Sequence, residues 1–162
     1  MKVHLYLTFD GNCSRAFDHY KEVFGTDIEC KMTWGDNPHK NKSKVALSEE
    51  KANQIMHMSM HLTKSFELMG CDTPPEGSCC GEGMGHEKFV VGNNMQINLE
   101  PDSKAHADKL IVALASKGGK VMNPMEEAFW GSYFGMCKDP FGVTWMLNCP
   151  LEANKDEKKE ED

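Results

Sequence analysis

Several features that mark large functional classes are missing from this chain of 162 residues. No apolar run approaches the roughly 20 residues that a membrane-spanning helix needs, and the first residues lack the charged, apolar and small-residue zones of a signal peptide. No stripe of basic residues with interleaved aromatics occurs, so the usual electrostatic basis for contacting a phosphate backbone is absent. We therefore expect a cytoplasmic protein that binds neither nucleic acid nor membrane.

Sequence motifs of several enzyme classes are absent as well. Gly81, Gly83 and Gly85 do not form a G-x-G-x-x-G turn between a strand and a helix, and the chain has no G-x-x-x-x-G-K-[ST] phosphate loop. The Gly131–Gly135 segment is not a G-x-S-x-G nucleophile elbow. These absences exclude the nucleotide-binding and hydrolase classes that such motifs mark.

Cysteine and charge are distributed unevenly. The seven cysteines are odd in number and lack the regular spacing of a disulfide scaffold, so reduced thiols are the simpler interpretation.

The net charge is −7, and residues 152–162 contribute part of it with three lysines and six acidic residues. Such a segment cannot bury enough apolar area to offset its ordering entropy. We expect 152–162 to be an acidic disordered tail.

One amphipathic helix is predicted near the start of the chain. Apolar residues recur between 13 and 24 at i, i+3, i+4, i+7, i+10 and i+11, which is the stripe of a surface helix. Asn12 is a suitable N-cap and Gly25 a suitable end for this helix.

A second helix with the same spacing follows much later. Ala107, Leu110, Ile111 and Leu114 form its apolar stripe. Its cap is either Asp102 or Ser103, and Gly118-Gly119 would end it. Each helix follows one predicted strand and precedes three, so the chain uses one module twice.

Alternating apolar and polar residues predict eight strands around the two helices. They lie near 3–9, 27–35, 52–62, 65–71, 93–100, 119–128, 131–138 and 143–149. The segments 36–51 and 72–92 read as irregular. We expect one domain over 1–151, with a first module at about 1–72, a linker at about 73–92 and a second module at about 93–151.

Two segments carry a family resemblance. Within Trp130–Asn148, the turn Asp139-Pro140-Phe141-Gly142 separates two alternating runs and predicts a β-hairpin, since Pro presets φ and Gly tolerates positive φ. Near the start, Phe9-Asp10-Gly11-Asn12 leads into the first helix, which ends Tyr20-Lys21-Glu22-Val23-Phe24-Gly25. Together these segments resemble the PhnB-like branch of the glyoxalase/bleomycin-resistance/dioxygenase superfamily, also called the vicinal oxygen chelate superfamily.

The resemblance implies an α+β fold: two tandem βαβββ modules forming a curled mixed sheet, or cup, with the helices packed outside. It also implies a homodimer and a small organic ligand held in the cup. Some members of the branch carry a ubiquinone methyltransferase label. The Gly-rich cofactor loop of such enzymes is absent here, so we expect no methyltransferase activity.

Strand alternation then selects the side chains that face the cup. The apolar set of each strand marks its helix-packed side, and the complementary set faces the interior. The aromatic residues that begin the last hairpin lie at the cup mouth according to the resemblance. The expected ligand-binding residues are His4, Tyr6, His57, Gln96, Asn98, Trp130, Phe134, Met146 and Asn148.

A metal site is the main alternative. Metal-dependent relatives bind one divalent ion through four strand positions, which correspond here to His4, Glu67, Gln96 and Met146. The first three side chains suit a divalent ion, but the thioether of Met146 cannot exchange a proton as the usual carboxylate does. We therefore predict no cofactor and name no catalytic residue, while His4, Glu67 and Gln96 are the candidates for a divalent metal.

Other constellations leave alternatives open. His57 and His61 lie about 13 Å apart along one strand, so they are separate groups, and either one can serve as a general base. Cys79-Cys80 with Cys71 and His86 is a soft-ligand cluster without the C-x₂-C spacing of a zinc knuckle, hence either a thiolate site or loop cysteines. Three functions follow: a ligand-binding protein of unknown reaction, a metal-dependent lyase or dioxygenase, and a drug-sequestering protein.

Overall fold

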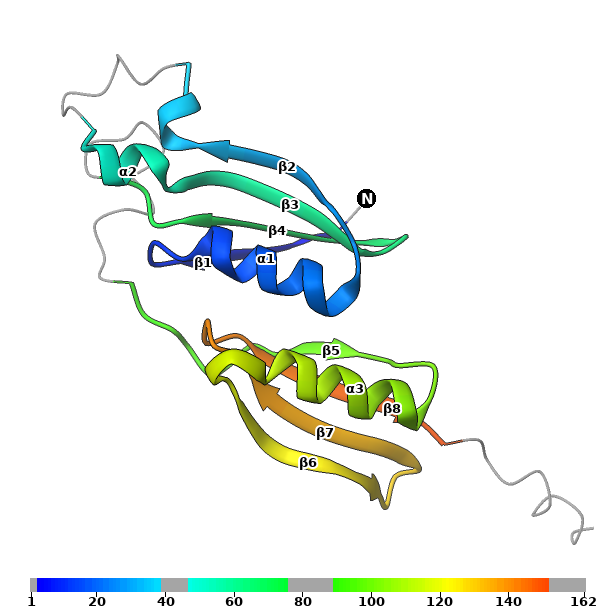
Figure 1. Ribbon diagram of the computed structural model, residues 1–162. Coiled ribbons are helices and arrows are strands. Elements are labelled where there is room, and N and C mark those ends of the chain that lie inside the picture. Colours follow the sequence, from blue (N-terminus) through cyan, green and yellow to red (C-terminus); the bar gives the residue numbers. More distant parts are fainter. Residues whose placement is uncertain (1–2, 39–46, 76–88, 152–162) are drawn as a thin grey trace, which may run out of the picture. The chain divides into compact units, whose positions relative to one another are not determined.

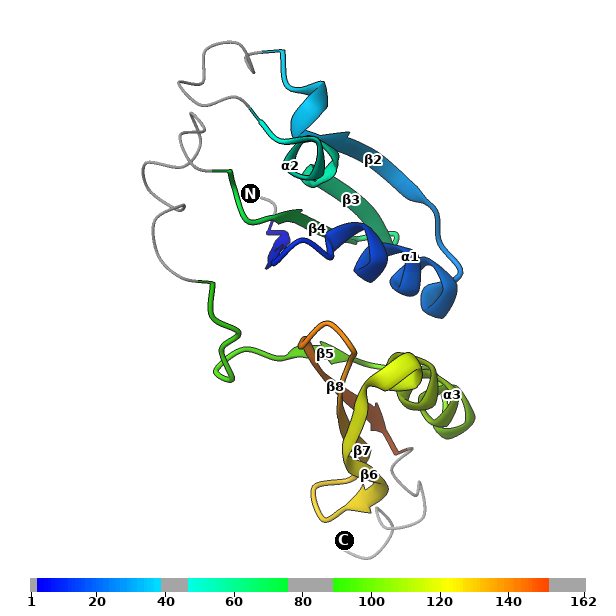
Figure 2. The same cartoon turned by 60° about the vertical axis from the view of Figure 1, so that its left-hand side comes forward.

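The structure is a computed structural model that describes residues 3–38, 47–75 and 89–151. Contacts divide the chain into two units, residues 1–91 and 92–162, and each unit is described by itself (Figures 1 and 2). Within the described ranges, no helix is long and apolar enough to cross a membrane.

The first unit is a four-stranded mixed sheet with one long helix against it (Figure 1). The strand order is β1-β4-β3-β2, in which β1 pairs with β4 in parallel and the other neighbours are antiparallel. Its elements are β1 (Leu5–Phe9), α1 (Cys13–Phe24), β2 (Ile28–Thr33), the 3₁₀ helix η1 (Trp34–Asp36), α2 (Glu49–Asn53), β3 (Ile55–Thr63) and β4 (Phe66–Asp72).

Helix α1 begins at a buried carboxylate from the end of the sheet. Asn12 occupies the predicted N-cap position, but its side chain makes no capping hydrogen bond. Instead the Cys13 N–H donates to Asp72 Oδ1 over 2.9 Å, and the Ile55 N–H donates to Asp72 Oδ2 over 2.8 Å. Asp72 thus satisfies a free N–H at the helix start and joins it to β3. Gly25 ends the helix with φ at 66°, as predicted.

The apolar stripe of α1 packs against β3 and β4. Phe17 and Tyr20 are fully buried on this stripe, and Met58, Met60 and Leu68 are fully buried on the sheet. Burying each such side chain stabilises the fold by roughly 1.5–3 kcal/mol. The face of the first and third strands that was expected to meet the helix is therefore the buried one.

One short helix was not predicted. Residues 49–51 were expected to be irregular and 52–62 to form a strand, whereas α2 spans Glu49–Asn53 and β3 starts at Ile55. Ser48 caps α2, because its hydroxyl accepts from the Lys51 N–H over 3.3 Å. The acidic first turn, Glu49-Glu50, complements the positive end of the helix dipole.

The second unit repeats the topology of the first. Its strand order is β5-β8-β7-β6, with β5 and β8 parallel and the other pairs antiparallel, and α3 packs against β6, β7 and β8. Its elements are β5 (Ile97–Leu99), α3 (Lys104–Leu114), the 3₁₀ helix η3 (Ser116–Gly118), β6 (Lys120–Ala128), β7 (Ser132–Lys138) and β8 (Thr144–Pro150).

Several boundaries in the second unit differ from the prediction. Strand β5 begins at Ile97 rather than near residue 93. Ser103, and not Asp102, caps α3 by accepting from the His106 N–H over 3.2 Å. The helix ends at Leu114, before the predicted Gly118-Gly119 stop, because η3 follows it.

The predicted hairpin is confirmed as β7 and β8. Its turn is held by Asp139, which is 3% exposed. Asp139 Oδ1 accepts from the N–H groups of Phe141 and Val143 at 2.8 and 2.9 Å, and Oδ2 accepts from Trp145 Nε1–H at 2.9 Å. The turn therefore depends on this carboxylate in addition to the Pro and Gly residues that predicted it. With two βαβββ modules in place, the predicted α+β class is confirmed.

Candidate functional site

Each sheet has a face turned away from its long helix, and most of the predicted ligand-binding residues lie there. In the first unit, register pairs Tyr6 with Met69, Ser59 with Met69 and His61 with Glu67, so these side chains share one face. The neighbouring Leu68 and Gly70 face α1, where a Cβ added to Gly70 would lie 2.9 Å from the Phe17 ring. The face opposite α1 in the first unit is called here the open face of that unit.

Tyr6 and His57 come together on this open face. The Tyr6 hydroxyl lies 3.4 Å from His57 Nδ1, and the two rings stack with centroids 5.9 Å apart and planes inclined by 28°. They come from β1 and β3, which are separated by β4. Both groups are partly exposed, with Tyr6 at 45%. The pair offers a ligand an aromatic surface, a hydroxyl and an imidazole that can donate, accept or take up a proton.

A row of alternating imidazole and carboxylate groups crosses the same face. His4 Nδ1 lies 3.2 Å from Glu67 Oε2, and His61 Nδ1 lies 2.7 Å from Glu29 Oε1. Glu67 and His61 are register partners, so the row reads His4, Glu67, His61, Glu29 across the four strands. Glu29 was not predicted, because it sits at a shift of register between Ile28 and Cys30 that disturbs the alternation of β2.

The row contains two of the three candidate metal ligands. His4 and Glu67, two of the three, are in contact, whereas Gln96 belongs to the second unit. Among the described residues, no group of three His, Cys, Asp or Glu side chains is arranged to hold a metal ion. Cys79, Cys80 and His86 lie outside the described residues. The first unit thus holds two of the three candidate ligands in contact with each other, and the third belongs to the other unit.

In the second unit, register brings together four of the predicted residues in two pairs. Asn98 pairs with Met146, and Phe134 pairs with Asn148. Met136 is also a register partner of Met146 and lines the same face. On the other side of the sheet, Gly135 faces α3, since a Cβ there would lie 3.1 Å from Ile111 Cδ1. The side that carries these pairs is the open face of the second unit.

The remaining predicted residues lie at the edges of this region. Trp130 is 53% exposed and packs edge-on to Phe134, with ring centroids 5.5 Å apart. Phe129 beside it is 99% exposed. Gln96 is exposed and just precedes β5, where its Nε2 donates to the Asn93 carbonyl over 3.5 Å. Gln96 therefore belongs to the approach to the strand and not to the strand itself.

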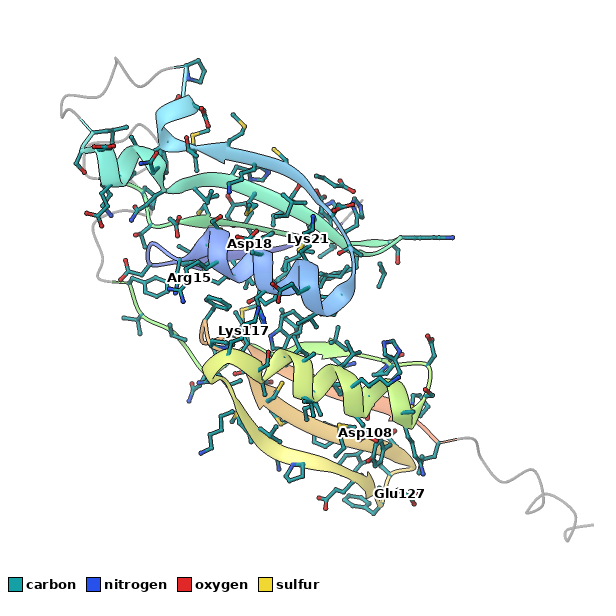
Figure 3. All side chains as sticks on the ribbon, viewed as in Figure 1. Arg15, Asp18, Lys21, Asp108, Lys117 and Glu127 are labelled. Carbon is teal, nitrogen blue, oxygen red and sulfur yellow. The ribbon has the colours of Figure 1, made fainter. Side chains whose placement is uncertain are left out.

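A polar cluster on the opposite side of the second sheet is structural. The Tyr133 hydroxyl donates to Asp108 Oδ1 over 2.9 Å, and Lys104 forms an ion pair with Glu127. Figure 3 labels the two acidic partners, Asp108 and Glu127. The hydrogen bond to the Asp108 carboxylate raises the pKa of Tyr133 above its usual value. Because these contacts tie α3 to the β6–β7 end, Glu127 belongs to the packing of the helix and not to the open face.

Known proteins match most of the length of the chain. The family model described as the Glyoxalase/Bleomycin resistance protein/Dioxygenase superfamily matches residues 2–147. Protein YjdN of Escherichia coli is 29% identical over 153 residues, which is 91% of this chain and 95% of YjdN.

Solved structures are also similar to this chain over most of its length. Protein PA1353 from Pseudomonas aeruginosa superimposes with a TM-score of 0.75 at 34% identity, covering 94% of this chain and 99% of that protein. A Bacillus cereus protein described as a 3-demethylubiquinone-9 3-methyltransferase, PhnB protein, gives a TM-score of 0.67 at 19% identity, covering 92% and 99%. At that identity the likeness is one of fold alone.

Proposed function

Because this chain belongs to the glyoxalase/bleomycin resistance protein/dioxygenase superfamily, as its motifs predicted, we propose that it binds a small organic molecule on the open faces of its two sheets. The observation that carries this proposal is the contact between Tyr6 and His57. Two polar aromatic groups from non-adjacent strands converge on a surface that the helix leaves uncovered. Convergent polar groups on a partly apolar wall are typical of small-molecule sites.

The open face of the second unit also carries groups that suit a ligand. Met136 and Met146 are adjacent there, and their flexible thioethers adapt to varied ligand shapes. Asn98 is the register partner of Met146, and Asn148 follows Met146 by two residues on β8, so both add amide groups beside the methionines. A ligand with a planar or apolar body and a few hydrogen-bonding groups suits each face taken by itself. No methyl transfer is proposed, since the chain lacks a Gly-rich cofactor loop.

The contribution of His57 can be tested with a control on the same strand. A panel of α-keto acids, α-hydroxy acids and planar aromatic compounds is screened by thermal shift, and the best compound is titrated by calorimetry. His57→Gln should weaken its binding about tenfold, the loss expected for one good hydrogen bond to a ligand. His61→Gln, which removes an imidazole paired with Glu29, should leave binding within about twofold.

Two outcomes would refute the proposal. One is a panel in which no compound raises the melting temperature. The other is equal weakening of binding by both histidine variants. Incubating the bound compound with the protein and following its NMR spectrum separates the remaining functions: product formation identifies an enzyme, whereas stoichiometric binding without product identifies a sequestering protein.

A divalent-metal-dependent lyase or dioxygenase is a second candidate, favoured by the 3.2 Å contact between His4 and Glu67. These two side chains would hold the ion, which would polarise a substrate oxygen, and Gln96 is the third ligand that the family resemblance suggests. Met146, at the fourth matching position, offers only a weak sulfur donor. Elemental analysis of protein purified without chelator is the test: a metal retained in Glu29→Ala but lost in Glu67→Ala would support this candidate, and wild-type protein without metal would refute it.

The assembly and location follow from the family resemblance. We propose a cytoplasmic homodimer. Light scattering should give about twice the chain mass of 18.2 kDa, and a monomer at micromolar concentration would contradict the assembly.

A further inference from the structure

A hollow in the second unit lies beside its open face. It has a volume of about 250 Å³ and is lined by Gly118, Gly119, Lys120, Met122, Lys138 and Asp139. The glycines belong to the connection from α3 to β6, while the lysines belong to β6 and β7. None of these residues was among the predicted ligand-binding positions, because the pairing of β6 with β7 was needed to bring them together.

Two lysines line this hollow. Lys120 and Lys138 are register partners on neighbouring antiparallel strands, so their side chains leave the same face of the sheet. Among the described residues, neither lysine makes an ion pair. Asp139 also lines the hollow, but its carboxylate is buried and accepts hydrogen bonds from its own turn and from Trp145. The lining thus holds two lysines and one carboxylate. Like charges placed directly opposite destabilise a sheet, and a bound anion would remove that repulsion.

The backbone next to the lysines is shaped for close approach. Lys117 adopts a left-handed conformation, with φ at 59°, and Gly118 follows with φ at 110° (Figure 3 shows Lys117 where α3 leads into β6). A Cβ added to Gly119 would lie 2.6 Å from the Lys138 carbonyl oxygen. Only glycine permits the connection to pass this close to β7. The connection therefore forms one wall of the hollow directly against the strand that carries Lys138.

We propose that this hollow binds the anionic group, a carboxylate or a phosphate, of the small molecule held on the open face of the second unit. Two lysines against one carboxylate leave an excess positive charge, which attracts an oxyanion and repels a cation. The surrounding chain carries a net charge of −7, so anions bound elsewhere on its surface gain little. The proposal assigns a class of ligand to the site and therefore rests in part on the proposed function.

Continuity with the open face supports this assignment. Met136 precedes Lys138 by two residues on β7, so both point to the same side, and Met136 is a register partner of Met146. Lys138 is also a register partner of Thr144. A ligand whose acid group lies between the lysines can thus extend its carbon skeleton along the two methionines. An amphipathic organic anion fits this sequence of contacts.

The hollow can be tested without knowing the natural ligand. Inorganic phosphate and acetate are each titrated into the full ¹⁵N-labelled chain at constant ionic strength. The amides of Gly118, Gly119, Lys120 and Lys138 should shift together and saturate. The double variant Lys120→Gln/Lys138→Gln should weaken that binding at least tenfold, whereas Lys64→Gln/Lys109→Gln, which removes the same charge elsewhere, should leave it unchanged.

The outcomes separate this inference from the proposed function. Shifts spread evenly over surface lysines, or equal weakening in both double variants, would refute the anion site. A further arm compares each organic acid of the ligand panel with its neutral methyl ester. Acids and esters that bind equally well, with affinity lowered by His57→Gln but not by Lys120→Gln/Lys138→Gln, would leave the small-molecule function intact and overturn the anion assignment. Preference for the acid that disappears in the lysine variant would support it.

Discussion

The Asp72 carboxylate accepts a hydrogen bond from the backbone N–H of Cys13, a residue that lies 59 positions earlier in the chain. Its second oxygen accepts from the N–H of Ile55. One buried side chain at the end of β4 therefore sets the start of α1 relative to the start of β3. In the second unit, Asp139 has a comparable role, because its carboxylate fixes a turn and a core tryptophan together.

Replacing Asp72 should destabilise the protein strongly. Asp72→Ala leaves two buried N–H groups without acceptors, which costs about 2–4 kcal/mol in free energy of unfolding. Denaturant titration followed by circular dichroism measures this loss. The matched control is Asp18→Asn, which removes the same charge from the exposed side of α1 and should change the stability by less than about 0.5 kcal/mol. Similar effects of both variants would contradict the capping role.

Replacing Asp139 should loosen the core of the second unit. Asp139→Ala removes the acceptor for two backbone N–H groups and for the indole N–H of fully buried Trp145. We expect a loss of about 2–4 kcal/mol and a red shift of tryptophan emission that Asp102→Ala does not produce. An unchanged denaturation midpoint would show that Pro140 and Gly142 suffice for the turn.

Lys117 offers a stabilising substitution. It is the one non-glycine residue with positive φ in the described part of the chain, at 59°. Lys117→Gly should raise the free energy of unfolding by about 0.5–1 kcal/mol, because glycine adopts this conformation without the clash of a Cβ. The same substitution at Lys109, inside α3, should instead cost about 0.8–1 kcal/mol. Thermal denaturation of both variants checks the opposite signs.

Burial should protect three thiols from alkylation. Burial raises the pKa of Cys13, Cys71 and Cys137, in the last case from 9.0 to about 12. Iodoacetamide at about pH 8 should modify half-buried Cys30 faster than these three, because the thiolate is the reactive form. Peptide mass spectrometry measures the labelling, and denaturant should abolish the difference. Equal labelling rates in the native protein would contradict the prediction.

The same shifts give a pH dependence of stability. In the unfolded chain the thiols ionise near their ordinary pKa of 9.0, while the folded chain keeps Cys137 protonated to about 12. The stability contribution is therefore complete below pH 9.0 and is lost as the pH rises toward about 12. Cys137→Ser, which does not ionise in this range, should show a smaller loss of stability over the same interval.

Periodicity predicted the sheets well because each sheet has one packed face. Trp145 and Leu147 alternate with the open-face residues of β8 and are fully buried against α3, as expected. The capping of α1 by Asp72 could not be predicted from the sequence, because no local pattern connects Asp72 to Cys13. Glu29 was missed because the register shift in β2 breaks the period of two on which the face assignments depend.

The unpredicted helix α2 did have a signal in the sequence. Ser48 followed by two glutamates is a helix start, and α2 begins there. The candidate site was only partly predictable for a different reason. His57 could be placed on a face by alternation, but its stacking on Tyr6 depends on the order of three strands. Lys120 and Lys138 likewise share a hollow only through the pairing of β6 with β7.

In each unit the first strand lies at the edge of the sheet and pairs only with the last, in parallel. During translation, Leu5–Phe9 therefore emerges from the ribosome long before Phe66–Asp72, the segment that supplies its hydrogen bonds. Parallel, non-local pairing of this kind is slow to form and leaves strand edges open meanwhile. The strand Leu5–Phe9 thus lacks its pairing partner until Phe66–Asp72 has also left the ribosome.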